Sequence, residues 1–143
     1  KLLETFWKKI GSKVDIMDAK QHDYILSITS HIPHLIAYNI VNTSLNIQGE
    51  KESSIVKYSA GGLRDFTRIA ASNPIMWRDV FIQNKKNTSE MIDKFIENLE
   101  GLKKAIENED GKKLEEIFTK TQKIRKEIIE AGQDVSKPDF GRK

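Results

Sequence analysis

Two arginines lie four residues apart in the segment AGGLRDFTRIAAS, residues 60–72. On a helix this spacing places Arg64 and Arg68 on one face, while the apolar residues between them can turn toward a core. A guanidinium is charged at any relevant pH and binds a carboxylate or phosphate through two parallel hydrogen bonds. The pair therefore suits a ligand that carries two anionic groups.

The residues around the arginines allow two interpretations. Gly61 and Gly62 would let a ligand or another chain approach the start of the helix, where free backbone amides also favour anions. The alternative is that Asp65 and neighbouring acidic residues pair with the arginines on the surface, as on many charged helix faces. Spacing alone leaves both interpretations open.

The segment SHIPHL places His31 and His34 three residues apart. They could bind a metal, line a ligand pocket, or pack with hydrogen bonds near the core. A zinc site normally has at least three protein ligands, and His22 would lie on the opposite side of the helix from His31. We therefore predict no metal site. The two histidines can line a ligand pocket only if their helix faces the helix that carries the arginines.

Two further candidates also have simpler interpretations. Trp77 could form a pocket wall, although a tryptophan near other large apolar residues is more often part of a core. His22 and Asp23 could form an orienting pair, but an aspartate near a helix start also interacts favourably with the helix dipole. The sequence has no glycine-rich phosphate loop and no Ser/His/Asp arrangement that suggests a nucleophile. These residues alone make an incomplete active site.

The composition favours one main core in a soluble protein. The 143 residues include 24 Lys and Arg against 21 Asp and Glu, and the net charge of +3 is spread along the chain. This distribution argues against nucleic acid as the main partner. There is no cysteine, which fits a reducing compartment, and no apolar run of about 18 residues that could cross a membrane. We expect a cytoplasmic protein with neither nucleic-acid nor membrane partners.

The first 17 residues predict a helix and a strand. Apolar residues at helical spacing run from Leu2 to Ile10, and Gly11 follows where a left-handed cap is favoured. Residues 13–17, KVDIM, alternate as in a short strand, which cannot satisfy its own backbone alone. Because the chain starts in helical periodicity without Met, we expect a piece of a longer protein whose sheet lies upstream.

The next segments predict helices with defined ends. Asp18 and Gln21 resemble a capping pair, and the residues that follow are apolar around most of the helix, which predicts a central, buried element. Pro33 predicts a kink or break in that helix near Ile32. Asn73-Pro74 should end the arginine-bearing helix and start the next one.

The last third of the chain predicts two helices with narrow apolar seams. They are joined at NEDGKK, a signal for an antiparallel hairpin, and the seams favour packing or a subunit interface over a cofactor site. The seam residues are Ile92, Phe95, Leu99, Leu102 and Ile106, then Leu114, Ile117, Thr121, Ile124 and Ile128.

Two segments, HDYILSITSHIPHLIA and AGGLRDFTRIAASNPIMWRDVFIQN, closely resemble the carboxy-terminal domain of prephenate dehydrogenases, a family that includes cyclohexadienyl and arogenate dehydrogenases. The resemblance implies an all-α fold, a helical dimerisation domain over residues 18–131. Residues 1–17 would be a helix–strand remnant of the end of a Rossmann nucleotide-binding domain, and residues 132–143 a flexible tail.

The resemblance also implies an activity for the full-length protein. In this family, an NAD- or NADP-dependent enzyme oxidatively decarboxylates prephenate to 4-hydroxyphenylpyruvate during tyrosine biosynthesis. The dinucleotide and the principal catalytic histidine belong to the Rossmann domain, so this fragment alone should hold no catalytic residue and be inactive. It would form a homodimer and bind prephenate or arogenate. The sequence decides neither between the two dinucleotides nor between the two substrates.

The resemblance implies six substrate-site residues: Arg68, Arg64, His34, His31, Asp65 and Trp77. The first arginine would bind a substrate carboxylate, and the second would give electrostatic support. The histidines would make polar contacts beside the substrate, the aspartate would orient its neighbours, and the tryptophan would form a pocket wall. The alternative is a purely structural or regulatory homodimerisation module whose arginines bind an anionic effector.

Overall fold

The computed structural model describes residues 1–48 and 58–132, which contain helices and no β-strand. The all-α fold predicted from the sequence is confirmed for these residues. The chain divides into two compact units, Lys1–Asp93 and Lys94–Lys143, and the second is described as far as residue 132. Each unit is described by itself below.

Helix α1 (Leu2–Lys9) ends at the predicted glycine. Gly11 has a φ of +90°, and the amides of Gly11 and Ser12 donate to the carbonyls of Lys8 and Trp7 over 3.1 and 3.0 Å. A glycine adopts this left-handed conformation without strain. The prediction of a strand at residues 13–17 was wrong, because residues 12–18 have no regular secondary structure. No other strand in the described residues offers them a hydrogen-bonding edge.

The next helical stretch has the predicted cap and the predicted break. Asp18 accepts a hydrogen bond from the Gln21 amide over 3.0 Å at the start of α2 (Ala19–Leu26). A π-helical turn, η1 (Ser27–His31), then separates α2 from α3 (Ile32–Gln48). Pro33 has no amide hydrogen for the helical ladder, and a wider turn accommodates such an interruption.

Burial of this stretch is restricted to one side. Ile32 is 4% exposed and Ala37 fully buried, whereas Ile28 is 50% and Val41 39% exposed. The prediction of a central, buried helix therefore holds for only one side of the described residues. The α5–η3 segment packs against α3.

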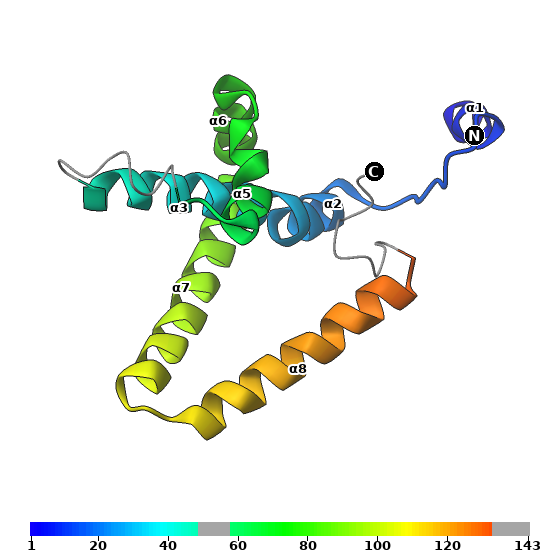
Figure 1. The fold of residues 1–143 in the computed structure, drawn as a ribbon. Coiled ribbons are helices and arrows are strands. Elements are labelled where there is room, and N and C mark those ends of the chain that lie inside the picture. Colours follow the sequence, from blue (N-terminus) through cyan, green and yellow to red (C-terminus); the bar gives the residue numbers. More distant parts are fainter. Residues whose placement is uncertain (49–57, 133–143) are drawn as a thin grey trace. The chain divides into compact units, whose positions relative to one another are not determined.

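Helix α5 (Gly61–Thr67) begins at the glycine pair and continues into a 3₁₀ turn, η3 (Arg68–Ala71). Both pack against α3, as Figure 1 shows, and the Tyr38 hydroxyl of α3 donates to the Ser72 carbonyl over 2.8 Å. The predicted boundary at Asn73-Pro74 is confirmed. Asn73 accepts from two amides of the first turn of α6 (Pro74–Gln83), where Pro74 needs no hydrogen-bond acceptor.

Helices α7 (Lys85–Glu107) and α8 (Gly111–Glu130) are joined by a short turn where the sequence predicts one. Asp110 caps α8 by accepting from the Lys113 amide over 2.9 Å. Within the second unit the two helices diverge from this turn (Figure 1), and Leu99, Ile106 and Ile124 are 53%, 64% and 48% exposed. The two seams therefore do not cover each other.

Candidate functional site

Three of the predicted site residues meet in one cluster of rings. The His34 ring stacks on Trp77 of α6 with the ring centroids 3.7 Å apart and the planes 25° apart. His31 approaches Trp77 edge-on at 6.2 Å, and Phe81 lies 5.5 Å from Trp77 one turn further along α6. The structure thus brings the histidine pair, which flanks the start of α3, against the aromatic side chains of α6.

The hydrogen bond of His34 determines which of its ring nitrogens carries the proton. His34 Nδ1 lies 2.9 Å from the carbonyl oxygen of Ser30, which can only accept. Nδ1 is therefore the donor, and in the neutral ring Nε2 keeps its lone pair. His34 is half-buried, and this nitrogen can accept a hydrogen bond from a ligand.

His31 is more deeply buried and has a different partner. His31 is only 7% exposed, and its Nδ1 lies 3.3 Å from the side-chain amide nitrogen of Asn84. Burial lowers the pKa of His31; the negative charge of Asp23 opposes this, while His22 and His34 add to it. Burial therefore favours the neutral ring of His31.

Sequence reasoning missed Asn84. This residue ends α6, and its side-chain amide also donates to the Asp23 carbonyl over 2.7 Å, so it connects α2, η1 and α6. The available signal was a polar Asn at the junction of two helices in IQNKKN. A helix-end Asn usually hydrogen-bonds locally, so the sequence alone gave no reason to pair it with residues more than fifty positions away.

The arginines lie elsewhere in the first unit. The α-helix expected to carry both ends at Thr67, so Arg68 belongs to the 3₁₀ turn that packs on α3. Arg64 Nε lies 3.6 Å from Asp65 Oδ1, and its side chain is 72% exposed. Arg68 is exposed and forms no hydrogen bond or ion pair within residues 1–48 and 58–132. The surface-pairing alternative thus describes Arg64 but not Arg68.

Neither arginine forms a hydrogen bond or an ion pair with the histidine–tryptophan cluster in the described part of the chain. A hydrogen bond from a side chain to the backbone connects the two regions. The Tyr38–Ser72 hydrogen bond holds the end of the arginine-bearing segment on α3, one turn beyond His34. An Arg68 without a protein partner on that segment has its five N–H donors available for an anion.

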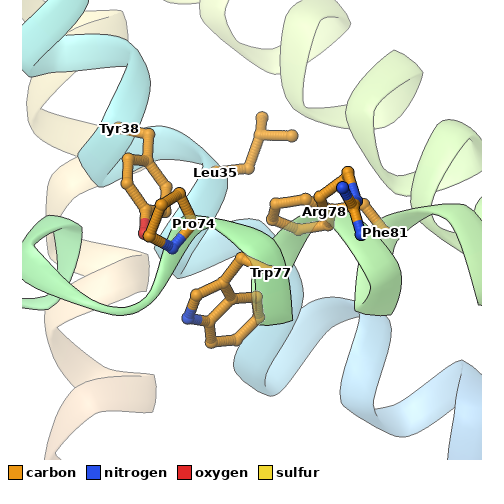
Figure 2. A pocket seen from close by; sticks show the side chains of 6 residues that line it. All are labelled: Leu35, Tyr38, Pro74, Trp77, Arg78 and Phe81. Carbon is orange, nitrogen blue, oxygen red and sulfur yellow. The ribbon is translucent and has the colours of Figure 1, made fainter.

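A hollow of about 280 Å³ lies beside the ring cluster, and Figure 2 shows its walls. Leu35 and Tyr38 come from α3, whereas Pro74, Trp77, Arg78 and Phe81 come from α6. Trp77 is 7% exposed and its indole nitrogen has no hydrogen-bond partner among the described residues. It is thus both a core residue and a wall, and the two interpretations offered by the sequence do not exclude each other.

His22 and Asp23 form a local surface pair. His22 Nδ1 lies 3.1 Å from Asp23 Oδ1, and both side chains are more than half exposed. Across the described ranges, no three His, Cys, Asp or Glu side chains gather where they could hold a metal. No described helix is long and apolar enough to cross a membrane.

Comparison with known families decides what kind of domain carries this site. A family model described as "Prephenate dehydrogenase, dimerization domain" matches residues 18–120. The chain belongs to this family. The match contains both segments on which the resemblance rested, and the ring cluster and the arginine-bearing segment lie within the prephenate dehydrogenase dimerization domain.

Curated relatives of this domain are longer proteins. The chain is 39% identical over 120 residues to a cyclohexadienyl dehydrogenase of Zymomonas mobilis, covering 84% of this chain and 41% of the relative. It is 34% identical over 125 residues to a prephenate dehydrogenase of Bacillus subtilis, covering 87% of this chain and 33% of the relative. The chain thus spans less than half the length of these relatives.

Solved structures agree with the family match. The crystal structure of a prephenate dehydrogenase from A. aeolicus in complex with hydroxyphenyl propionate and NAD+ superposes with a TM-score of 0.82 at 38% identity. The match covers 89% of this chain and 44% of that one. A Synechocystis arogenate dehydrogenase superposes with a TM-score of 0.78 at 18% identity, which shows a shared fold.

Proposed function

We propose that this chain is the substrate-binding and dimerisation domain of an NAD(P)-dependent prephenate dehydrogenase. The full enzyme would oxidatively decarboxylate prephenate, or act on arogenate, in cytoplasmic tyrosine biosynthesis. The observation that carries this proposal is the combination of a stacked His34–Trp77 pair with an exposed, unpaired Arg68 in a domain of this family.

Arg68 is proposed to bind a substrate carboxylate. Its guanidinium has no ion pair among the described residues, so no protein anion there has to be displaced before a ligand binds. Arg64 is proposed to add positive potential, because its contact with Asp65 is 3.6 Å long and its own side chain is 72% exposed. Asp65 is proposed to orient its neighbours.

The ring cluster is proposed to position the substrate. Trp77 and His34 offer a flat surface and a polar edge, a combination that suits a six-membered ring bearing a hydroxyl group. Their positions are supported by packing and by the Ser30 hydrogen bond before any ligand binds. Such preorganisation lowers the entropic cost of orienting a substrate.

The seams of the second unit are proposed as the homodimer interface. The crevice between α7 and α8 has a volume of about 540 Å³ and is lined by Leu102, Ile117 and Ile124 together with polar and charged residues. A second copy can cover the exposed seam residues of the first, and in a two-fold dimer the covering is mutual. Residues 18–131 would form this domain, and residues 1–17 would belong to the end of a nucleotide-binding domain.

The dinucleotide is proposed to bind mainly to that other domain. The printed sequence contains no glycine-rich loop that would place a backbone against a pyrophosphate. NAD or NADP supplies the hydride acceptor when bound, whereas this chain would hold the carboxylates and the ring. The 143-residue chain alone is therefore proposed to be inactive.

Calorimetric titration of prephenate into this chain tests the proposal, with Arg68→Ala and Arg125→Ala as a matched pair of variants. Arg125 is also exposed, but it lies on α8, outside the unit that carries the ring cluster. We expect weak binding whose free energy becomes less favourable by about 2–5 kcal/mol in Arg68→Ala, because a charge partner is lost. Arg125→Ala should bind as the unmodified chain does.

Sedimentation of the same samples gives the oligomeric state. A well-folded dimer whose affinity for prephenate is the same with and without Arg68 would contradict the substrate assignment. A folded dimer that binds other small anions through Arg68, but not prephenate, would instead support a regulatory dimerisation module.

A further inference from the structure

Asn84 is a candidate for controlling the hydrogen-bonding properties of His31. The two contacts of its side-chain nitrogen reach the Asp23 carbonyl at 2.7 Å and His31 Nδ1 at 3.3 Å. A primary amide nitrogen carries two hydrogens and does not accept hydrogen bonds, so it can donate to both partners at once.

The orientation of the Asn84 amide follows from its partners. A carbonyl oxygen only accepts, so the atom next to the Asp23 carbonyl must be the nitrogen. The other end is then the oxygen, and it accepts from the Asn87 side chain over 2.8 Å. A reversed amide would set oxygen against oxygen at the shorter of these contacts.

This orientation restricts His31. Since the atom that faces Nδ1 is a donor, Nδ1 must hold a lone pair, and the neutral ring must carry its hydrogen on Nε2. Nε2 forms no hydrogen bond with the described residues, and His31 lines a hollow of about 360 Å³ together with His22, Asp23 and Asn84. His34 has the reverse arrangement, because its Nδ1 donates to Ser30.

We propose that Asn84 is a positioning residue that holds His31 in the Nε2–H tautomer, opposite to the Nδ1–H tautomer of His34. The two histidines are three residues apart, and their Nε2 atoms then have opposite roles. Nε2 of His31 is a hydrogen-bond donor, whereas Nε2 of His34 has a lone pair that accepts. The two histidines therefore do not duplicate each other. Exchanging the donor and acceptor roles of their Nε2 atoms would require breaking one hydrogen bond of each ring.

The consequence for a ligand rests on the proposed function. A carboxylate or carbonyl oxygen can accept from His31, whereas a hydroxyl group can donate to the neutral ring of His34. Prephenate carries both kinds of group. Asn84 touches neither in this scheme and acts only through His31.

Nitrogen-15 NMR of the imidazole rings tests the inference in the 143-residue chain, which has only three histidines. At pH 8, above the ordinary histidine pKa of about 6.5, long-range proton–nitrogen correlations distinguish the two neutral tautomers. We expect the proton on Nε2 in His31 and on Nδ1 in His34. A His31 proton on Nδ1 would overturn the inference directly.

Asn84→Asp sharpens the test, because a carboxylate can only accept at the position where the amide donates. We expect His31 to place a hydrogen on Nδ1 and its proton affinity to rise about tenfold or more, since the carboxylate also favours the imidazolium. Asn84→Ala should abolish the tautomer preference without adding charge. In both variants the His34 signals should keep their Nδ1–H pattern.

Asn108→Asp is the matched control, because Asn108 is exposed in the turn after α7 and the change adds the same charge. It should leave the tautomer of His31 unaltered. If Asn84→Asp and Asn84→Ala both left that tautomer and its proton affinity unchanged, Asn84 would have no positioning role. The rings are observed without ligand, so failure of prephenate to bind would overturn the proposed function and not this inference.

Discussion

The ring cluster of the first unit and the seams of the second unit use their large side chains in contrasting ways. In residues 1–93, Trp77 is 7% exposed and stacks on a histidine of the same chain. In the second unit, Leu99 and Ile124 occupy equally regular positions on their helices but are 53% and 48% exposed. The ring cluster is completed within one chain, whereas the seams present apolar surfaces that the proposed homodimer would cover.

The difference follows from the chemistry of the residues. Indole and imidazole rings combine flat apolar faces with polar atoms, so a few local partners can fix their position. Aliphatic side chains on a narrow seam have no directional partner and gain stability only in proportion to the area removed from water. A single pair of diverging helices offers them too little area.

The largest effect should come from placing charges on the seams. In the variant Leu99→Lys with Ile124→Lys, each substitution appears twice in a two-fold dimer, and the ammonium groups lose water without gaining partners. We expect association to weaken by about 5 kcal/mol or more, several thousandfold in Kd, as measured by sedimentation over a range of concentrations.

Glu116→Lys is the control for that variant, because it adds a lysine to α8 at an exposed position away from the seam. It should remain as dimeric as the unmodified chain. If the double seam variant also kept its dimer, the contrast between a ring cluster completed within one chain and seams covered by a second chain would fail.

Removing the central ring of the first unit should have the next largest effect. Trp77→Ala should lower the free energy of unfolding by about 3–5 kcal/mol, because a buried indole leaves a cavity and His34 loses its stacking surface. Urea denaturation at one fixed protein concentration measures this change.

The chain supplies a matched control in its other tryptophan. Trp7 on α1 is 47% exposed and touches Phe6. Trp7→Ala should cost less than about 1 kcal/mol, as surface substitutions usually do. Equal losses in the two variants would mean that the first unit has no distinct core at Trp77.

The smallest effect should be a pH dependence that comes from His31. Its pKa is lowered on folding, mainly by burial, so the unfolded chain binds more protons than the folded chain in mildly acidic solution. The stability contribution is complete above the ordinary pKa of about 6.5 and is lost as pH falls toward the lower pKa of the folded state.

His31→Gln removes this titration while leaving an oxygen that can accept from Asn84. We expect the unfolding free energy to fall less steeply between pH 7 and pH 5.5 in the variant, by no more than about 1.4 kcal/mol per pH unit for one proton. Parallel curves for the variant and the unmodified chain would show that His31 takes up its proton equally well in both states.

Helix ends were the most predictable part of the fold. The caps at Asp18 and Asn73 and the left-handed Gly11 each depend on residues within one turn, so the sequence contains all their determinants. The strand at residues 13–17 was predicted wrongly because a strand depends on a partner that its own residues do not specify.

The candidate site also combines features that local sequence determines with features that depend on distant partners. The sequence by itself determined the residue types that can bind a dianion, the positions of the helices that carry them, and the family, since each depends on local spacing or on motif identity. Only the tertiary structure decided that His34 stacks on Trp77 and that Asn84 reaches His31. Contacts across more than forty residues depend on how helices pack, and periodicity within each helix does not encode which partner its faces meet.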